Sequence, residues 1–290
     1  MKIALILIVF STSFGVKAQQ DFVSSAFWNN YAHVNPAMSS LEFRRHASFM
    51  YRRDQFGSLY SADRIMANAN ILLAEKHGVG VVYDLSTYSL LKSSSAKLNY
   101  NYRLNFSEDR GLSFGASLGV TTNKLPDDYG DTYLPSDTSI QLVIKGVYFT
   151  PSVGLGYNSR NFMIGFGITN IAEGEISNLR EDEVNISPVR NYYLNGHYKI
   201  NLGSKKNLEI RPQFLVRTDL SFTSIDLNAL VTYKKRYWAG ITYRNRDAFA
   251  FMLGWDIKKK IRVGYSFDWI QSKLTTAKSS AHELGIGIFL

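Results

Sequence analysis

The chain has 290 residues, a net charge of +9, no cysteine and a mean hydropathy of −0.14. Without cysteine it has no disulfide bond, no thiolate metal site and no lipid-modified cysteine, so backbone pairing and packing alone must hold it together. The length suits one large β domain or two small ones. The basic balance suits contact with nucleic acid or with anionic lipid.

The first residues predict export. Lys2 precedes an apolar run at 3–10, and Val16-Lys17-Ala18 has the small residues of a cleavage site. We therefore expect a signal peptide at 1–18 and a mature charge of +7, which is +9 less Lys2 and Lys17. A membrane anchor is disfavoured because a spanning helix needs about 20 apolar residues. Export also argues against a nucleic-acid partner.

Residues 42–290 alternate between apolar and polar side chains, which predicts β-strands with one apolar and one polar face. The pattern is clearest at 112–121, where Leu, Phe, Ala, Leu and Val alternate with Ser, Gly, Ser, Gly and Thr. Fourteen segments follow it, at 42–54, 58–74, 77–86, 91–106, 110–123, 146–158, 161–171, 189–202, 206–217, 223–234, 236–246, 248–258, 260–270 and 280–290.

The connections between these segments alternate in length. Tight turns are expected near 75–76, 107–109, 159–160, 203–205, 234–236 and 258–260, and the longer set includes 124–145, 172–188 and 271–279. Short periplasmic turns and longer outer loops are typical of an up-and-down transmembrane barrel. The even strand count then puts both termini in the periplasm. Residues 19–41, before the first strand, are expected to be a periplasmic or luminal segment that supplies part of a plug.

A soluble β-sandwich is the alternative fold, and two features argue against it. Sandwich strands average about five or six residues, whereas these segments are long enough to cross a bilayer at a tilt. Aromatic residues lie near the ends of the apolar faces, as membrane girdles require; they include Tyr157, Tyr192, Tyr237, Trp255 and Trp269. The predicted fold is therefore an all-β transmembrane antiparallel barrel of about 14 strands over residues 42–290.

A series of short motifs runs along the mature chain in a fixed order. They are Asn35-Pro36-Ala37, Tyr51-Arg52-Arg53-Asp54-Gln55-Phe56, Gly78-Val79-Gly80, Leu112-Ser113-Phe114-Gly115, Trp238-Ala239-Gly240 and Ala281-His282-Glu283-Leu284. Their order and spacing resemble the PorP/SprF family of Bacteroidetes outer-membrane proteins. The second motif departs from the family's Tyr-Arg-x-Gln-Trp by one extra residue and by Phe56 in place of Trp.

The resemblance implies a role in type IX secretion or gliding motility, at the outer membrane. It implies partners in the periplasmic ring and the translocon, and a secreted adhesin or other cargo with a C-terminal sorting domain. It implies no enzymatic activity and no cofactor. The alternative function is an outer-membrane porin or small-solute transporter.

Charged residues of both signs fall on the inward face of the predicted strands. Either they pair across the lumen and stiffen the barrel, or they line a selective pore. The set is Arg44, Arg52, Asp54, Lys97, Arg103, Lys199, Glu209, Arg211, Arg217, Asp226, Arg244, Asp256, Arg262, Asp268 and Glu283.

Two short motifs are candidate partner-binding sites. The turn lysines Lys234, Lys235, Lys258 and Lys259 suit contact with anionic lipid headgroups, or with an acidic face of a periplasmic ring component. Asn35 and Pro36 form either a partner contact or a turn that enters the first strand.

No catalytic or metal site is expected. The five histidines do not have metal-binding spacing, and the sequence has no GxSxG motif. The glycine pairs Gly165/Gly167 and Gly285/Gly287 are expected to be inward strand glycines, because no helix follows them as a phosphate loop requires. A lipid-modifying barrel enzyme is a further alternative, for which no residue set stands out.

Overall fold

The computed structural model describes residues 24–41, 44–54, 61–88, 91–124, 145–172, 187–203, 207–245, 247–271 and 279–289. The predicted signal peptide at 1–18 lies outside the described residues, as do most of the long connections expected at 124–145, 172–188 and 271–279. No helix within the described ranges has the length and apolar character to cross a membrane.

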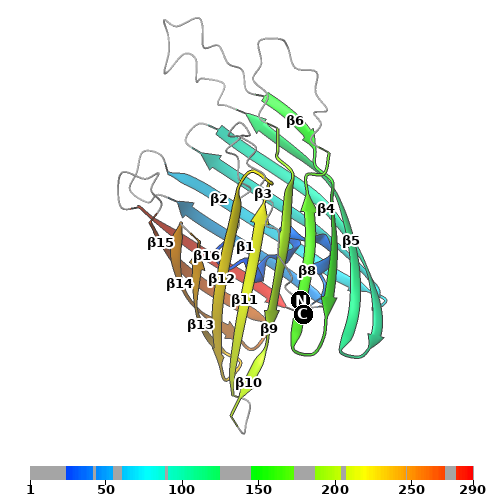
Figure 1. Cartoon of the computed structure of the whole chain (residues 1–290), viewed down its shortest axis with the longest axis vertical. Coiled ribbons are helices and arrows are strands. Elements are labelled where there is room, and N and C mark those ends of the chain that lie inside the picture. Colours follow the sequence, from blue (N-terminus) through cyan, green and yellow to red (C-terminus); the bar gives the residue numbers. More distant parts are fainter. Residues whose placement is uncertain are drawn as a thin grey trace, which may run out of the picture.

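The described strands form one closed antiparallel sheet (Figure 1). They are β1 Arg45–Asp54, β2 Ala62–Leu73, β3 His77–Tyr88, β4 Leu91–Ser107, β5 Arg110–Lys124, β6 Lys145–Phe149, β7 Ser152–Asn158, β8 Phe162–Thr169, β9 Asn191–Tyr198, β10 Ile200–Leu202, β11 Leu208–Thr218, β12 Thr223–Tyr233, β13 Tyr237–Arg244, β14 Ala248–Ile257, β15 Ile261–Ile270 and β16 Ser279–Phe289.

Two barrel strands are each divided into two segments by a short interruption. β6 and β7 both pair with β5, and β9 and β10 both pair with β11. The 16 segments therefore make 14 barrel strands (16 − 2). The predicted all-β, fourteen-stranded antiparallel barrel is confirmed.

The barrel has two different ends. β1 pairs with β16 so that His46 lies opposite Phe289, and this end also carries the tight turns; we call it the turn end. The opposite end carries the longer connections and is called the loop end. Turns at 74–76, 234–236 and 258–260 lie at the turn end, and Asp54, Tyr88 and Ile270 close their strands at the loop end.

The two faces of the wall have inverted polarity relative to a soluble protein. Outward residues such as Leu98 and Leu118 are apolar and 67% and 62% exposed, and they lie opposite one another on β4 and β5. Inward residues such as Asn99 and Ser117 are polar and buried. An apolar band of this kind is stable when it faces lipid.

The described N-terminal segment lies inside the barrel. It forms three short helical turns, η1 (Phe27–Asn29), α1 (Tyr31–Val34) and η2 (Pro36–Met38), and η2 contacts β4, β5, β7 and β8 (Figure 1). We call residues 24–41 the plug. Its Phe27, Trp28 and Tyr31 are buried with inward wall side chains in the main apolar cluster of the described residues.

The apolar band gives a test of membrane crossing. Leu118→Arg places a charge on the lipid face near the middle of β5, and we expect it to lower the free energy of unfolding by about 2–4 kcal/mol. Thr122→Arg, on the same face near the loop end, should cost about 0–1 kcal/mol. Urea titration of barrels folded in lipid vesicles measures both. Equal costs at the two positions would contradict this placement of the band.

Candidate functional site

The Asn-Pro-Ala motif forms the centre of the plug. Asn35 is fully buried, and its side-chain oxygen accepts a hydrogen bond from the Ala37 backbone N–H at 2.9 Å, which caps η2. Pro36 occupies the first position of η2, where the missing N–H costs nothing. The Asn35 amide donates to the Leu155 carbonyl of β7 at 3.0 Å. One side chain therefore both shapes the plug and attaches it to the wall.

The wall is built to let the plug backbone approach. Four inward glycines, Gly115, Gly154, Gly165 and Gly167, face this motif, and we call them the glycine seat. A Cβ at Gly115 would overlap the backbone of Pro36 and Ala37, and one at Gly167 would overlap the Val34 carbonyl oxygen. Any larger residue would occupy space that the plug needs, so the seat is specific for glycine.

Apolar contacts hold the other face of the plug. Trp28 packs edge-on against Trp238 of β13, with ring centroids 5.2 Å apart and an interplanar angle of 89°. The Arg262 guanidinium lies 4.8 Å from the Trp28 ring centroid and forms an ion pair with Asp256 at 2.7 Å. Inward aromatic and aliphatic residues thus replace polar ones where the wall meets the plug.

A network of charges binds the start of the plug. Arg52 on β1 forms ion pairs with Asp54 at 2.7 Å, Asp268 at 2.8 Å and Glu283 at 3.5 Å. Arg244 pairs with Asp226 at 3.1 Å and lies 3.8 Å from Asp268. We call this set of six residues the luminal ion cluster, and all six lie toward the loop ends of their strands.

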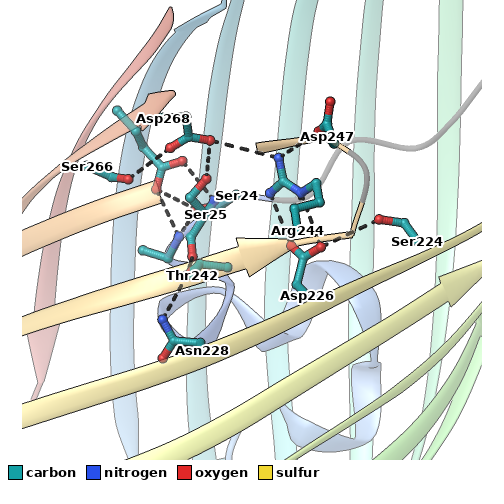
Figure 2. Close-up of polar contacts among 12 residues, drawn as sticks. Ser24, Ser25, Ser224, Asp226, Asn228, Thr242, Arg244, Asp247, Ser266 and Asp268 are labelled. Carbon is teal, nitrogen blue, oxygen red and sulfur yellow. Dashed lines mark hydrogen bonds and ion pairs between the residues drawn. The ribbon is translucent and has the colours of Figure 1, made fainter. Parts of the chain in front are cut away.

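Two plug serines complete this cluster. Ser24 donates to Glu283 at 2.5 Å, and Ser25 donates to Asp268 at 2.6 Å and, through its backbone N–H, to Glu283 at 3.1 Å. Figure 2 shows Asp268 in contact with both Ser25 and Arg244. The buried carboxylates of Asp268 and Glu283 thus each have an arginine and a plug donor, as burial of charge requires.

The inward charges predicted from sequence largely pair within the lumen; besides the cluster, Arg211 lies 2.8 Å from Glu209. Arg44, which was also predicted to point inward, does not join these luminal pairs. It precedes β1, its side chain is 64% exposed, and it contacts Glu75 at 3.3 Å. Backbone alternation fixes side-chain direction only inside a strand, and Arg44 lies outside it.

The candidate turn lysines lie far from the plug motif. Lys234, Lys235, Lys258 and Lys259 are exposed at the turn end and have φ values of 52°, 52°, 49° and 57°. Such paired positive φ values favour Asn-Gly, and a non-glycine residue there costs about 1–3 kcal/mol. Asn35 and Pro36, by contrast, are buried inside the barrel. The structure therefore separates the six candidate residues into an internal pair and an external basic surface.

The sequence analysis missed the inward apolar residues Met163, Tyr193, Leu215, Trp238 and Met252, which receive the plug. Their signal was available, because each is an apolar residue at a position that the alternation assigns to the polar face. A set of such exceptions predicts something apolar inside the barrel.

Comparison with known proteins identifies the family. The model of the type IX secretion system membrane protein PorP/SprF family matches residues 16–288. This chain belongs to the PorP/SprF family. The resemblance expected from its motifs is confirmed. No curated protein sequence gives a significant match.

Several solved structures have a similar fold. The Ralstonia pickettii toluene transporter TbuX has a TM-score of 0.54 at 10% identity, covering 88% of this chain and 92% of its own. A Pseudomonas aeruginosa FadL homologue has a TM-score of 0.52 at 10% identity, covering 87% of this chain and 91% of its own. Acinetobacter baumannii outer membrane protein Omp33 has a TM-score of 0.50 at 10% identity, covering 86% of this chain and 99% of its own. At these identities the likeness concerns the fold of this PorP/SprF barrel alone.

The glycine seat gives a prediction about what keeps this PorP/SprF barrel closed. Gly115→Ala with Gly167→Ala should expel the plug, because both new methyl groups overlap plug backbone. We expect ion conductance in planar bilayers and chymotrypsin cleavage at Phe27, Trp28 or Tyr31, and we expect neither from the unmodified protein. Gly285→Ala is the control, since its Cβ meets nothing closer than 4.0 Å. A folded double variant that stays closed and resists the protease would refute the role of the seat.

The luminal ion cluster gives a prediction about the stability of the barrel. Arg52→Ala leaves Asp268 and Glu283 without their main counter-charge, so the free energy of unfolding should fall by about 3–5 kcal/mol. Arg44→Ala removes an exposed pair and should cost at most about 1 kcal/mol. Adding Asp268→Asn to Arg52→Ala should recover part of the loss, measured by urea unfolding. Strictly additive effects would show that the two residues do not interact.

Proposed function

We propose that this chain is a closed outer-membrane anchor of the type IX secretion system or gliding machinery, which links the periplasmic ring, the translocon or a specific secreted cargo to the membrane. The occupied lumen carries the proposal. A barrel of fourteen strands has room inside for more than its own wall side chains, and here residues 24–41 take that room. Because the lumen is filled, passage of solute through it is disfavoured, and a role in attachment to partners is favoured.

The direction of the barrel follows from export. A signal peptide at 1–18 would deliver the chain to the periplasm, and outer-membrane barrels have their short turns on that side. The turn end, with Lys234, Lys235, Lys258 and Lys259, then faces the periplasm. These lysines would contact anionic lipid headgroups and dock an acidic face of a ring component.

The backbone of the two basic turns supports the docking role. The Ala74-Glu75 turn at the same end has the same positive-φ geometry, with φ values of 46° and 61°, but no lysine at its centre. Basic charge is therefore no requirement of the turn itself. Lysine at four strained positions indicates that the charge has a use which offsets its conformational cost.

A porin or small-solute transporter is the second candidate, favoured by the fold shared with the toluene transporter TbuX. The two functions differ in a measurable property. Reconstituted protein with an intact plug should pass no ions as an anchor, whereas channel-level conductance or solute uptake would favour the transporter.

The turns supply the test of the docking role. Replacing Lys234-Lys235 and Lys258-Lys259 by Asn-Gly pairs should relieve strain and preserve or raise barrel stability. The same change removes four positive charges, so we expect at least a tenfold loss of periplasmic ring proteins that co-purify in detergent.

The matched control is Ala74→Asn with Glu75→Gly, which relieves the same backbone without removing basic charge. This control should retain the ring proteins. If the lysine variants insert normally and co-purify as before, the basic turns are not the docking surface.

A further inference from the structure

A cavity with both polar and apolar lining residues lies between the plug and the loop ends of β3 and β4. It has a volume of about 500 Å³, its floor is His33 and Val34 of the plug, and it extends to Tyr88 and Leu91. Ligand pockets span about 300–1,000 Å³, so the cavity is large enough for a small organic molecule or a few peptide residues. We call it the vestibule.

Hydroxyl and amide groups line much of the vestibule. Ser95 and Thr121, which lie on neighbouring strands, bond to one another through their hydroxyl oxygens at 3.0 Å. Asn123 and Asn170 add amide groups to the lining. Such groups bind polar ligands by hydrogen bonds.

Two of the charged residues that line the vestibule already interact with other charged or aromatic groups of the protein. The Asp84 carboxylate is 2.8 Å from the Nδ1 atom of His33, so it already interacts with a plug residue. The Arg64 guanidinium lies 3.4 Å from Asp54 and 4.4 Å from the centroid of the Tyr88 ring. Both groups are therefore engaged by other parts of the protein.

Lys97 differs from these two residues. Its ammonium donates to the Asn170 side-chain oxygen at 3.4 Å, and no carboxylate in the described part of the chain forms an ion pair with it. An ammonium that is half withdrawn from water without a counter-charge is electrostatically unfavourable. The most direct compensation is an anion bound in the cavity that the ammonium lines.

The wall makes room for this lysine. Gly119 on β5 lies opposite Lys97, and a Cβ there would come within 2.5 Å of Lys97 Cγ and 3.1 Å of Thr150 Oγ1. The lysine stem therefore lies over a glycine, which fixes its course along the wall. Lys97 is thus built into the lining and is not a solvated surface lysine.

We propose that the vestibule is a binding site for a carboxylate-bearing ligand, with the Lys97 ammonium as the principal contact and the hydroxyl groups of Ser95 and Thr121 as further donors. The ligand is either a small free carboxylate or an acidic peptide segment. The site lies at the opposite end of the barrel from the basic turns, so it does not depend on docking there.

The test is calorimetric titration of the full-length protein in detergent. Citrate serves as the small carboxylate, tri-glutamate as the peptide and tri-glutamine as its neutral match. We expect saturable binding of at least one anion and none of tri-glutamine. Citrate alone would indicate a free solute, and tri-glutamate alone a peptide.

Two variants distinguish the site from general charge attraction. Lys97→Gln should weaken anion binding about tenfold or more, the loss expected for a charged hydrogen bond. It should preserve or raise barrel stability, because it removes an ammonium that has no counter-charge. Lys92→Gln removes an exposed lysine on the opposite face of β4 and should bind like the unmodified protein. Absence of anion binding, equal binding of tri-glutamine, or undiminished binding by Lys97→Gln would overturn the proposal.

Discussion

The structure depends on how a wide barrel fills its interior. Fourteen tilted strands enclose more space than the inward side chains of the wall occupy, and the outward face is committed to lipid. The chain fills that space with residues 24–41, which precede the first strand. Because the plug brings backbone close to the wall at Gly115 and Gly167, and serines to the carboxylates of Asp268 and Glu283, wall and plug are complementary in both shape and charge.

Much of the barrel was predictable because its signal is local. Side chains alternate along each strand, so the composition of a segment such as 112–121 shows both its conformation and its faces. The lengths of the turns could be predicted from the spacing between the alternating segments alone. Inward direction was also predictable for Gly165 and Gly167, since it follows from the same alternation.

The site was less predictable because its contacts are remote in sequence. Nothing near Asn35 shows that it binds the Leu155 carbonyl, or that Ser25 meets Asp268 across the lumen. Asn-Pro in isolation equally suits a turn or a partner contact, and only the assembled wall makes it internal. Two strands are interrupted at Thr150 and Lys199, and the segments on either side pair with β5 and β11 respectively. Side-chain alternation gives no information about these pairings, so the interruptions could not be predicted from it.

The most direct test of the occupied lumen is a cross-link between plug and wall. The chain has no native cysteine, so Asn30→Cys with Ser48→Cys places a single pair where the native side chains are 2.5 Å apart. After oxidation in the membrane and denaturation, trypsin cleavage at Arg44 and Arg45 should leave two fragments joined until reduction. Cysteine at the outward neighbour Phe49 should give no such link. Failure of the Ser48 pair to join in a folded barrel would contradict the plugged lumen.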